Sequence, residues 1–152
     1  MSELSHNVAQ ACAESYSDNK DCNKFVKDFA AKVGVKLPGG IDLDADGIIA
    51  GMETHWRNLS QEQAISAAGR GVFVVAGLKK KDIKTPHTNG HVCVVIPGRH
   101  GAFPRVYSTS ADKTVKFGRS QGDTHLSGFV FRSEDAKNVQ YFGPTTGSSG
   151  SW

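Results

Sequence analysis

A cysteine and a histidine in this chain occupy positions that suit nucleophilic catalysis. Cys22 lies at the predicted start of an amphipathic helix, and His91 opens an apolar segment much later in the chain. A thiol is a strong nucleophile when it ionises, and the free N–H groups and dipole of a helix N-terminus stabilise the thiolate. A neighbouring imidazole can accept the thiol proton and return it to a leaving group. The alternative for Cys22 is that it only packs, as a small apolar residue.

The helix that carries Cys22 is predicted from its apolar periodicity. Asn19 or Asp21 can supply an N-cap oxygen, and Gly34 suits the position just after the helix end. The sequence Pro-Gly-Gly at 38–40 prevents continuation. One apolar face at helical spacing is formed by Cys22, Phe25, Val26, Phe29, Ala30 and Val33. Cys22 is therefore expected in the first turn, at the edge of the buried face.

Helical patterns fill the first half of the chain and strand patterns fill the second. Helices are predicted over 4–16, through Ile49, Met52, Trp56 and Leu59, and from a capping sequence at 60–63 up to Gly69. Strands are predicted over 72–76, 91–96, 105–110, 128–131 and 138–142, with Pro97-Gly98 ending the second. This order indicates an α+β domain in which the N-terminal helices pack on an antiparallel β-sheet. We expect residues 1–142 to form a single catalytic domain and 143–152, rich in Gly, Ser and Thr, to form a flexible tail.

Composition limits the function classes. The chain has 152 residues and a formal net charge of +3, which is too small to indicate nucleic-acid binding. It has no apolar stretch that could cross a membrane, and its first residues lack the features of a secretory signal. We therefore expect a monomer that is made in the cytoplasm without a signal peptide. Three cysteines without a Cys-x-x-Cys pair argue against a disulfide framework or a structural zinc site, and Cys12 and Cys93 are expected to pack.

A second motif suggests a cation site. Asp42, Asp44 and Asp46 alternate, Gly47 stands at the sixth position and Glu53 at the twelfth, as in a calcium-binding loop. The Pro-Gly-Gly sequence before it removes the entering helix of an EF-hand. The alternative is an acidic loop in which Asp46 caps the next helix. Calcium would be structural, because thiol chemistry requires no cofactor.

Three segments, in order, resemble the type VI secretion amidase effectors. They are 21–26 (DCNKFV), 71–79 (GVFVVAGLK) and 90–96 (GHVCVVI), and the likeness extends from Val8 to Tyr107. These effectors are small peptidoglycan-cleaving enzymes of the NlpC-type, papain-like superfamily. The likeness is strongest to the first effector family, which hydrolyses the γ-D-glutamyl–meso-diaminopimelate bond.

The resemblance implies the site residues. Cys22 matches the nucleophile and His91 the base, which takes the thiol proton during attack or rests with the thiolate as an ion pair. The residue that orients the imidazole falls near Ser108, with Asp112 as the alternative. A serine hydroxyl can accept from the imidazole N–H but stabilises its charge less than a carboxylate does. We expect the small residue Gly90 to leave room for substrate beside His91.

The resemblance also implies a biological setting. An antibacterial effector of this family is secreted by the type VI machinery into the periplasm of a target cell, cuts peptidoglycan there, and is neutralised in the producer by a cognate immunity protein. Two alternatives remain open from the sequence. One is a housekeeping cell-wall hydrolase of the same superfamily, and the other is a non-catalytic calcium-binding interaction module.

Overall fold

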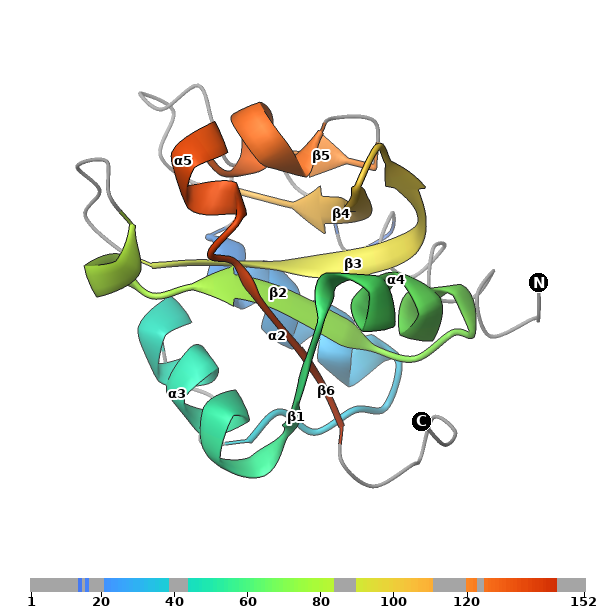
Figure 1. The fold of residues 1–152 in the computed structure, drawn as a ribbon. Helices are drawn as coiled ribbons and strands as arrows, with labels where there is room; N and C mark the ends of the chain where they lie inside the picture. The colour runs from blue at the N-terminus through green and yellow to red at the C-terminus, as the bar shows by residue number, and fades with distance from the viewer. Residues whose placement is uncertain are drawn as a thin grey trace.

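A six-stranded sheet with helices on both faces organises the protein (Figure 1). The computed structural model describes residues 14, 16, 21–38, 44–83, 90–110, 120–122 and 125–144. The strands are β1 (Arg57–Leu59), β2 (Val74–Leu78), β3 (His91–His100), β4 (Phe103–Ser108), β5 (Ser120–Gln121) and β6 (Gln140–Gly143). Their order is β1-β6-β2-β3-β4-β5, and every neighbouring pair is antiparallel.

One face of the sheet is covered by α2 (Cys22–Lys32) and α3 (Ala45–His55). The two helices bury apolar side chains at helical spacing against the strand residues that alternate toward them. The buried members of this layer are Phe25, Val26, Phe29, Ala30, Ala45, Ile48, Ile49, Met52, Phe73, Val75, Val92, Val94, Ile96 and Phe142. The stacked rings of Phe29 and Phe73, 5.2 Å between centroids, join α2 to the sheet. This core fixes the position of the N-terminus of α2, where Cys22 lies.

The opposite face is covered by α4 (Gln61–Gly69), the π-turn η2 (Leu126–Val130) and the short helix α5 (Ser133–Ala136). The capping box predicted at 60–63 is present, because the Ser60 and Gln63 side chains each accept from the other residue's backbone N–H. Small residues such as Ala64, Ala67 and Ala68 let α4 lie close to the sheet. A short 3₁₀ turn, η1 (Lys80–Asp82), follows β2.

Three details differ from the sequence prediction. The third helix ends at His55 instead of continuing to Leu59, because Trp56 is extended and 57–59 pair with β6 as an edge strand. The strand that begins at His91 continues past Pro97-Gly98 to His100. Its pairing with β4 shifts register between Ile96 and Arg99, and a bulge of this kind accommodates a proline because it interrupts the ladder of hydrogen bonds. The predicted strand 128–131 is wrong, since Gly128, at φ +95°, turns the chain within η2.

The other fold predictions that fall on described residues are confirmed. The α+β class, the Cys22 helix and the remaining strands are present, with bounds shifted by a few residues. The predicted helix 4–16 lies outside the described residues, except for positions 14 and 16. Most of the predicted tail also lies outside them, but its first residue, Gly143, pairs with Arg57 in the sheet. The division into a domain and a tail stays a prediction. Among the described helices, none combines the length and apolar character needed to span a membrane.

Candidate active site

Cys22 is the first residue of α2 and is half-buried. Asp21 occupies the N-cap position without a side-chain cap, and its carbonyl accepts the Phe25 N–H at 3.0 Å. The side chain of Asp21 does not cap the helix, and the backbone N–H groups of Cys22 and Asn23 act on the Cys22 thiol. At the other end Gly34 has φ +75°, as a left-handed residue after the helix requires. The sequence therefore placed the cysteine correctly, at a helix start and on the edge of its buried face.

His91 opens β3, with only 6% of its surface exposed. Its Nε2 lies 2.7 Å from the Oγ of Ser108, which is fully buried at the end of β4. The ring of Phe131 packs edge-on against the imidazole, with 5.3 Å between ring centroids. The hydroxyl and the aromatic ring together restrict the imidazole to one orientation. Asp112, the other candidate for this orienting role, lies outside the described residues.

The end of the β3–β4 pairing brings Cys22 beside the start of β3. Register partners between these strands end at Val94 and Tyr107, and Ser108 then pairs with Ser120 of β5. The backbone N–H of Val92, the residue after His91, lies close to the Cys22 thiol and favours its charged form. The Thr109 hydroxyl donates to the Asp21 carbonyl over a longer 3.4 Å. The N-terminus of α2 thus occupies the opening where β4 separates from β3.

The surroundings of Cys22 favour a neutral thiol at rest. Burial raises its pKa from 9.0 to about 11, and the Asp21 carboxylate adds to this effect. Backbone N–H groups of Val92, Asn23 and Cys22 itself act in the opposite direction but do not cancel the burial. Of the two resting states left open by the sequence, this favours a thiol that loses its proton to His91 during attack over a preformed ion pair.

Gly90 leaves room for a carboxylate of the protein and not for substrate. A Cβ at this position would lie 2.1 Å from Asp46 Oδ1 and 2.9 Å from the Leu78 carbonyl oxygen. The same Asp46 oxygen accepts the Lys80 N–H at 3.0 Å. Asp46, in the first turn of α3, therefore joins the end of β2 to the start of β3. The expectation that Gly90 opens space for substrate was wrong on this point.

Each carboxylate of the predicted calcium loop that the structure describes has its own protein partner. Asp44 accepts the Gly47 N–H at 2.9 Å as the N-cap of α3, and Asp46 accepts from Lys80 as above. Glu53 forms an ion pair with Lys79 at 2.5 Å, and the hydrogen bond that Lys79 donates is the main cause of the lowered pKa of Glu53. Asp42 lies outside the described residues, and among those described no group of three or more such side chains converges to hold a metal. The calcium site stays a prediction.

Several site residues were not identified from the sequence. The sequence pattern predicts a strand at Phe131 and gives no site role to Thr109 or to the Val92 N–H. Their roles depend on where β4 leaves β3 and on how η2 folds back, and neither has a local sequence signal. Cys93, predicted to pack, is fully buried on β3, and burial raises its pKa.

Comparison with known proteins adds an independent line of support. No family model matches the chain. Over 153 aligned residues the chain is 33% identical to the peptidoglycan amidase Tse1 of Pseudomonas aeruginosa, and the alignment covers 93% of this chain and 92% of that protein. Identity at this level over nearly the whole of both chains establishes common descent. The family predicted from the sequence is confirmed, and the chain belongs to the family of the peptidoglycan amidase Tse1.

Proposed function

We propose that this protein is a cysteine amidase that hydrolyses the stem peptide of peptidoglycan, with Cys22 as nucleophile, His91 as base and Ser108 as the residue that orients His91. The observation that carries the proposal is the meeting of two elements. The half-buried thiol at the start of α2 lies against the N–H of Val92, and His91, one residue earlier, is held by Ser108. Membership in the Tse1 family supports peptidoglycan as the polymer.

The proposed reaction begins with a proton transfer. His91 accepts the Cys22 proton as the sulfur attacks the amide carbonyl, which matches the neutral resting thiol. A C–S bond forms, and the carbonyl oxygen becomes an oxyanion that backbone N–H groups near the start of α2 can stabilise. His91 then gives its proton to the departing amine as the C–N bond breaks. Water attacks the thioester, His91 again acts as base, and the free thiol is restored.

The bond we propose is γ-D-glutamyl–meso-diaminopimelate, as the sequence resemblance implies. Cleavage there frees the amine of the diaminopimelate residue and leaves a new carboxylate on D-glutamate. Mass spectrometry of muropeptides after digestion identifies the bond, because each stem-peptide cut gives fragments of different mass. Fragments that end elsewhere in the stem peptide would contradict this assignment while leaving the amidase activity intact.

The catalytic roles are tested by replacing each residue. Cys22→Ala and His91→Ala are expected to fold and to leave purified peptidoglycan intact, since a general base alone is typically worth about 10²–10⁴ in rate and loss of the nucleophile costs more. Cys93→Ala is the matched control, because it removes a fully buried thiol without a proposed catalytic role. Release of soluble fragments by Cys22→Ala would overturn the mechanism.

We further propose that the protein acts as an antibacterial effector, delivered by type VI secretion into the periplasm of a rival cell. An immunity protein of the producer would cover the site. When a signal sequence directs the protein to the periplasm of a test bacterium, we expect lysis, whereas the same protein kept in the cytoplasm should be harmless. Cys22→Ala directed to the periplasm should also be harmless. Toxicity of that variant would show that killing does not depend on hydrolysis and would contradict the proposed effector mechanism.

A further inference from the structure

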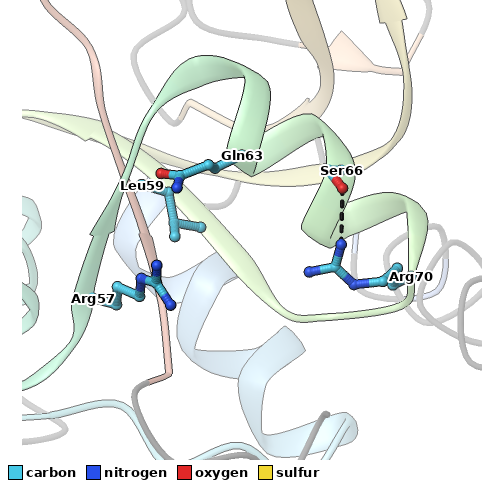
Figure 2. Close-up of a pocket in the computed structure, with 5 residues that line it drawn as sticks. All are labelled: Arg57, Leu59, Gln63, Ser66 and Arg70. Atoms are coloured by element: carbon cyan, nitrogen blue, oxygen red, sulfur yellow. Dashed lines mark hydrogen bonds between the residues drawn. The ribbon is translucent and has the colours of Figure 1, made fainter. Parts of the chain in front are cut away.

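The sheet ends in two edge strands, and one of them borders the candidate active site (Figure 1). At one edge, β1 is separated from β3 and His91 by β6 and β2. The pocket between β1 and α4, lined by Leu59 and by exposed polar side chains, lies on that distant edge (Figure 2). At the other edge, β5 pairs with β4, which carries Ser108. The contacts that hold β5 therefore bear on the position of Ser108.

The backbone of Ser108 is paired with β5 and not with β3. The register of β3 with β4 ends at Val94 and Tyr107. Ser108 then pairs with Ser120 of β5, a strand of only two residues, and so short a ladder is unstable without further contacts. The Oγ of Ser108 lies 2.7 Å from Nε2 of His91, so a displacement of about 1 Å moves the two atoms beyond hydrogen-bond distance.

Further contacts are made by Gly122, the residue that follows β5. Its N–H donates to the Val106 carbonyl oxygen at 3.0 Å and to the Ser120 Oγ at 3.1 Å. Its carbonyl oxygen accepts from the Nε of Arg105 at 2.9 Å. The N–H has two acceptors, so loss of the Ser120 hydroxyl leaves the shorter bond to Val106 in place. Arg105 is the side chain that holds the carbonyl end of Gly122 against β4.

The Arg105 side chain is itself fixed by its surroundings. It is half-buried and lies across the bulge of β3, since a Cβ on Gly98 would be 2.8 Å from the Cδ of Arg105. On the other side, a Cβ on Gly122 would be 3.1 Å from its Nη2. The Nη1 lies 3.5 Å from the Pro97 carbonyl oxygen. The two glycines thus provide the space for a planar guanidinium, whose donors point in fixed directions. Arg105 joins the bulge of β3 to the residue after β5.

We propose that Arg105 is a positioning residue for the reaction, a role that rests on the proposed functions of His91 and Ser108. Arg105 holds Gly122 and with it β5, β5 holds the backbone of Ser108, and Ser108 orients the imidazole. Positions 105 and 108 alternate to opposite faces of β4, so Arg105 acts through Ser108 and not by contact with the imidazole. When Ser108 is released, the imidazole loses its preference for the Nε2–H tautomer, which leaves Nδ1 to accept the thiol proton.

A double-mutant cycle tests whether Arg105 acts through Ser108. Arg105→Met removes the donors and keeps an unbranched stem, and we expect kcat to fall about two- to fivefold with little change in KM. In a Ser108→Ala background the same change should have no further effect on kcat. Arg105→Lys keeps the stem and a donor and should recover most of the activity. Losses of kcat that add in the double variant would contradict the proposal.

Arg99→Met is the matched control for loss of a positive charge on the same hairpin. Arg99 borders the same bulge but pairs with Glu62 of α4 at 2.7 Å, so kcat should not change. A loss of kcat equal to that of Arg105→Met would show a general effect of charge or of hairpin stability and would also contradict the proposal.

A second measurement follows the imidazole directly and needs no turnover. Nitrogen chemical shifts of His91 in the Cys22→Ala background should indicate the Nε2–H tautomer, and Arg105→Met should move them toward a mixture of tautomers, whereas Arg99→Met should not. Urea unfolding identifies the variants that fold, and Arg105→Gln takes the place of Arg105→Met if that variant does not. Unchanged His91 shifts in a folded Arg105 variant overturn the positioning role. Intact peptidoglycan after treatment with the wild-type enzyme overturns the proposed function instead, and the shifts still decide whether Arg105 positions His91.

Discussion

The Nε2 atom of His91 lies 2.7 Å from the Oγ of Ser108, and both side chains are buried. The two residues come from adjacent strands, and β4 leaves β3 just before Ser108 is reached. A hydroxyl in this position can accept a hydrogen bond from an Nε2–H of the imidazole, and that tautomer leaves Nδ1 to accept the thiol proton. Ser108 is therefore suited to a positioning role, weaker than that of a carboxylate.

Replacing Ser108 tests that role. Ser108→Ala removes one hydrogen bond to the imidazole, and we expect kcat to fall about fivefold while KM changes little, because a neutral hydrogen bond is worth about 1 kcal/mol. Peptidoglycan hydrolysis followed by fragment release measures both constants. Ser120→Ala is the control, since Ser120 is also a buried serine but its Oγ accepts the Gly122 N–H at 3.1 Å. An equal loss of kcat in both variants would indicate a general packing effect.

The neutral resting thiol predicts a specific pH dependence. Because the pKa of Cys22 is raised to about 11, alkylation of the free enzyme by iodoacetamide should be slow at pH 6 and rise steadily to pH 10 without a plateau. Peptide mass spectrometry assigns the label to Cys22 and separates it from the other two cysteines. A plateau below neutral pH that disappears in His91→Ala would establish a resting ion pair and contradict the neutral thiol.

How far the sequence predicts the site depends on whether a role is local. Cys22 and its helix were predictable because periodicity, cap and end signals all lie within 21–34. His91 was predictable because Gly90 and the apolar strand mark its position. Ser108 came only from the family resemblance. The Val92 N–H and Phe131 depend on strand separation and on the π-turn, which are tertiary features that the local pattern does not encode.

The contact between Gly90 and Asp46 predicts that position 90 accepts only glycine. Gly90→Ala places a methyl group within 2.1 Å of the Asp46 carboxylate and 2.9 Å from the Leu78 carbonyl oxygen, so the Asp46 side chain must turn away from Lys80 and the backbone next to His91 must shift slightly. Overpacking of this kind costs about 1–3 kcal/mol, and we expect both the free energy of unfolding and kcat to fall. Urea unfolding measures the first quantity. Gly69→Ala is the control, because its new methyl group meets no atom within 4 Å.

Partial recovery of kcat in the Gly90→Ala, Asp46→Ala double variant would confirm that the clash is the cause, since that variant removes the carboxylate. Wild-type activity in Gly90→Ala alone would contradict the positioning of β3 by Asp46.

The ion pair between Glu53 and Lys79 predicts a pH window for a small stability contribution. The hydrogen bond that Lys79 donates to Glu53 lowers the pKa of Glu53 below 4.5. The contribution of Glu53 to stability is therefore fully present above pH 4.5 and is lost as the pH falls through the folded pKa. The pKa of Lys79 is raised above 10.5, so its part is present below that value and is lost in stronger base. Lys79→Met should lower the free energy of unfolding at pH 7 by less than about 1 kcal/mol, because Glu53 is 36% exposed. The deficit should shrink as the pH falls below 4.5 and through the folded pKa of Glu53, and Lys80→Met, at the exposed neighbour, should show no such window.

The same ion pair gives a test of the calcium loop predicted from the sequence. If 42–53 binds calcium, Glu53 must release Lys79 to become the bidentate ligand of the twelfth position. Removing the competing ammonium in Lys79→Met should then tighten calcium binding relative to wild type. Calorimetric titration with millimolar calcium measures the affinity. Glu53→Gln is the matched control, because it removes the charge of the twelfth-position ligand and should weaken calcium binding. Absence of binding heat in both wild type and Lys79→Met would contradict the site and leave Asp44 and Asp46 with the structural contacts they make in α3.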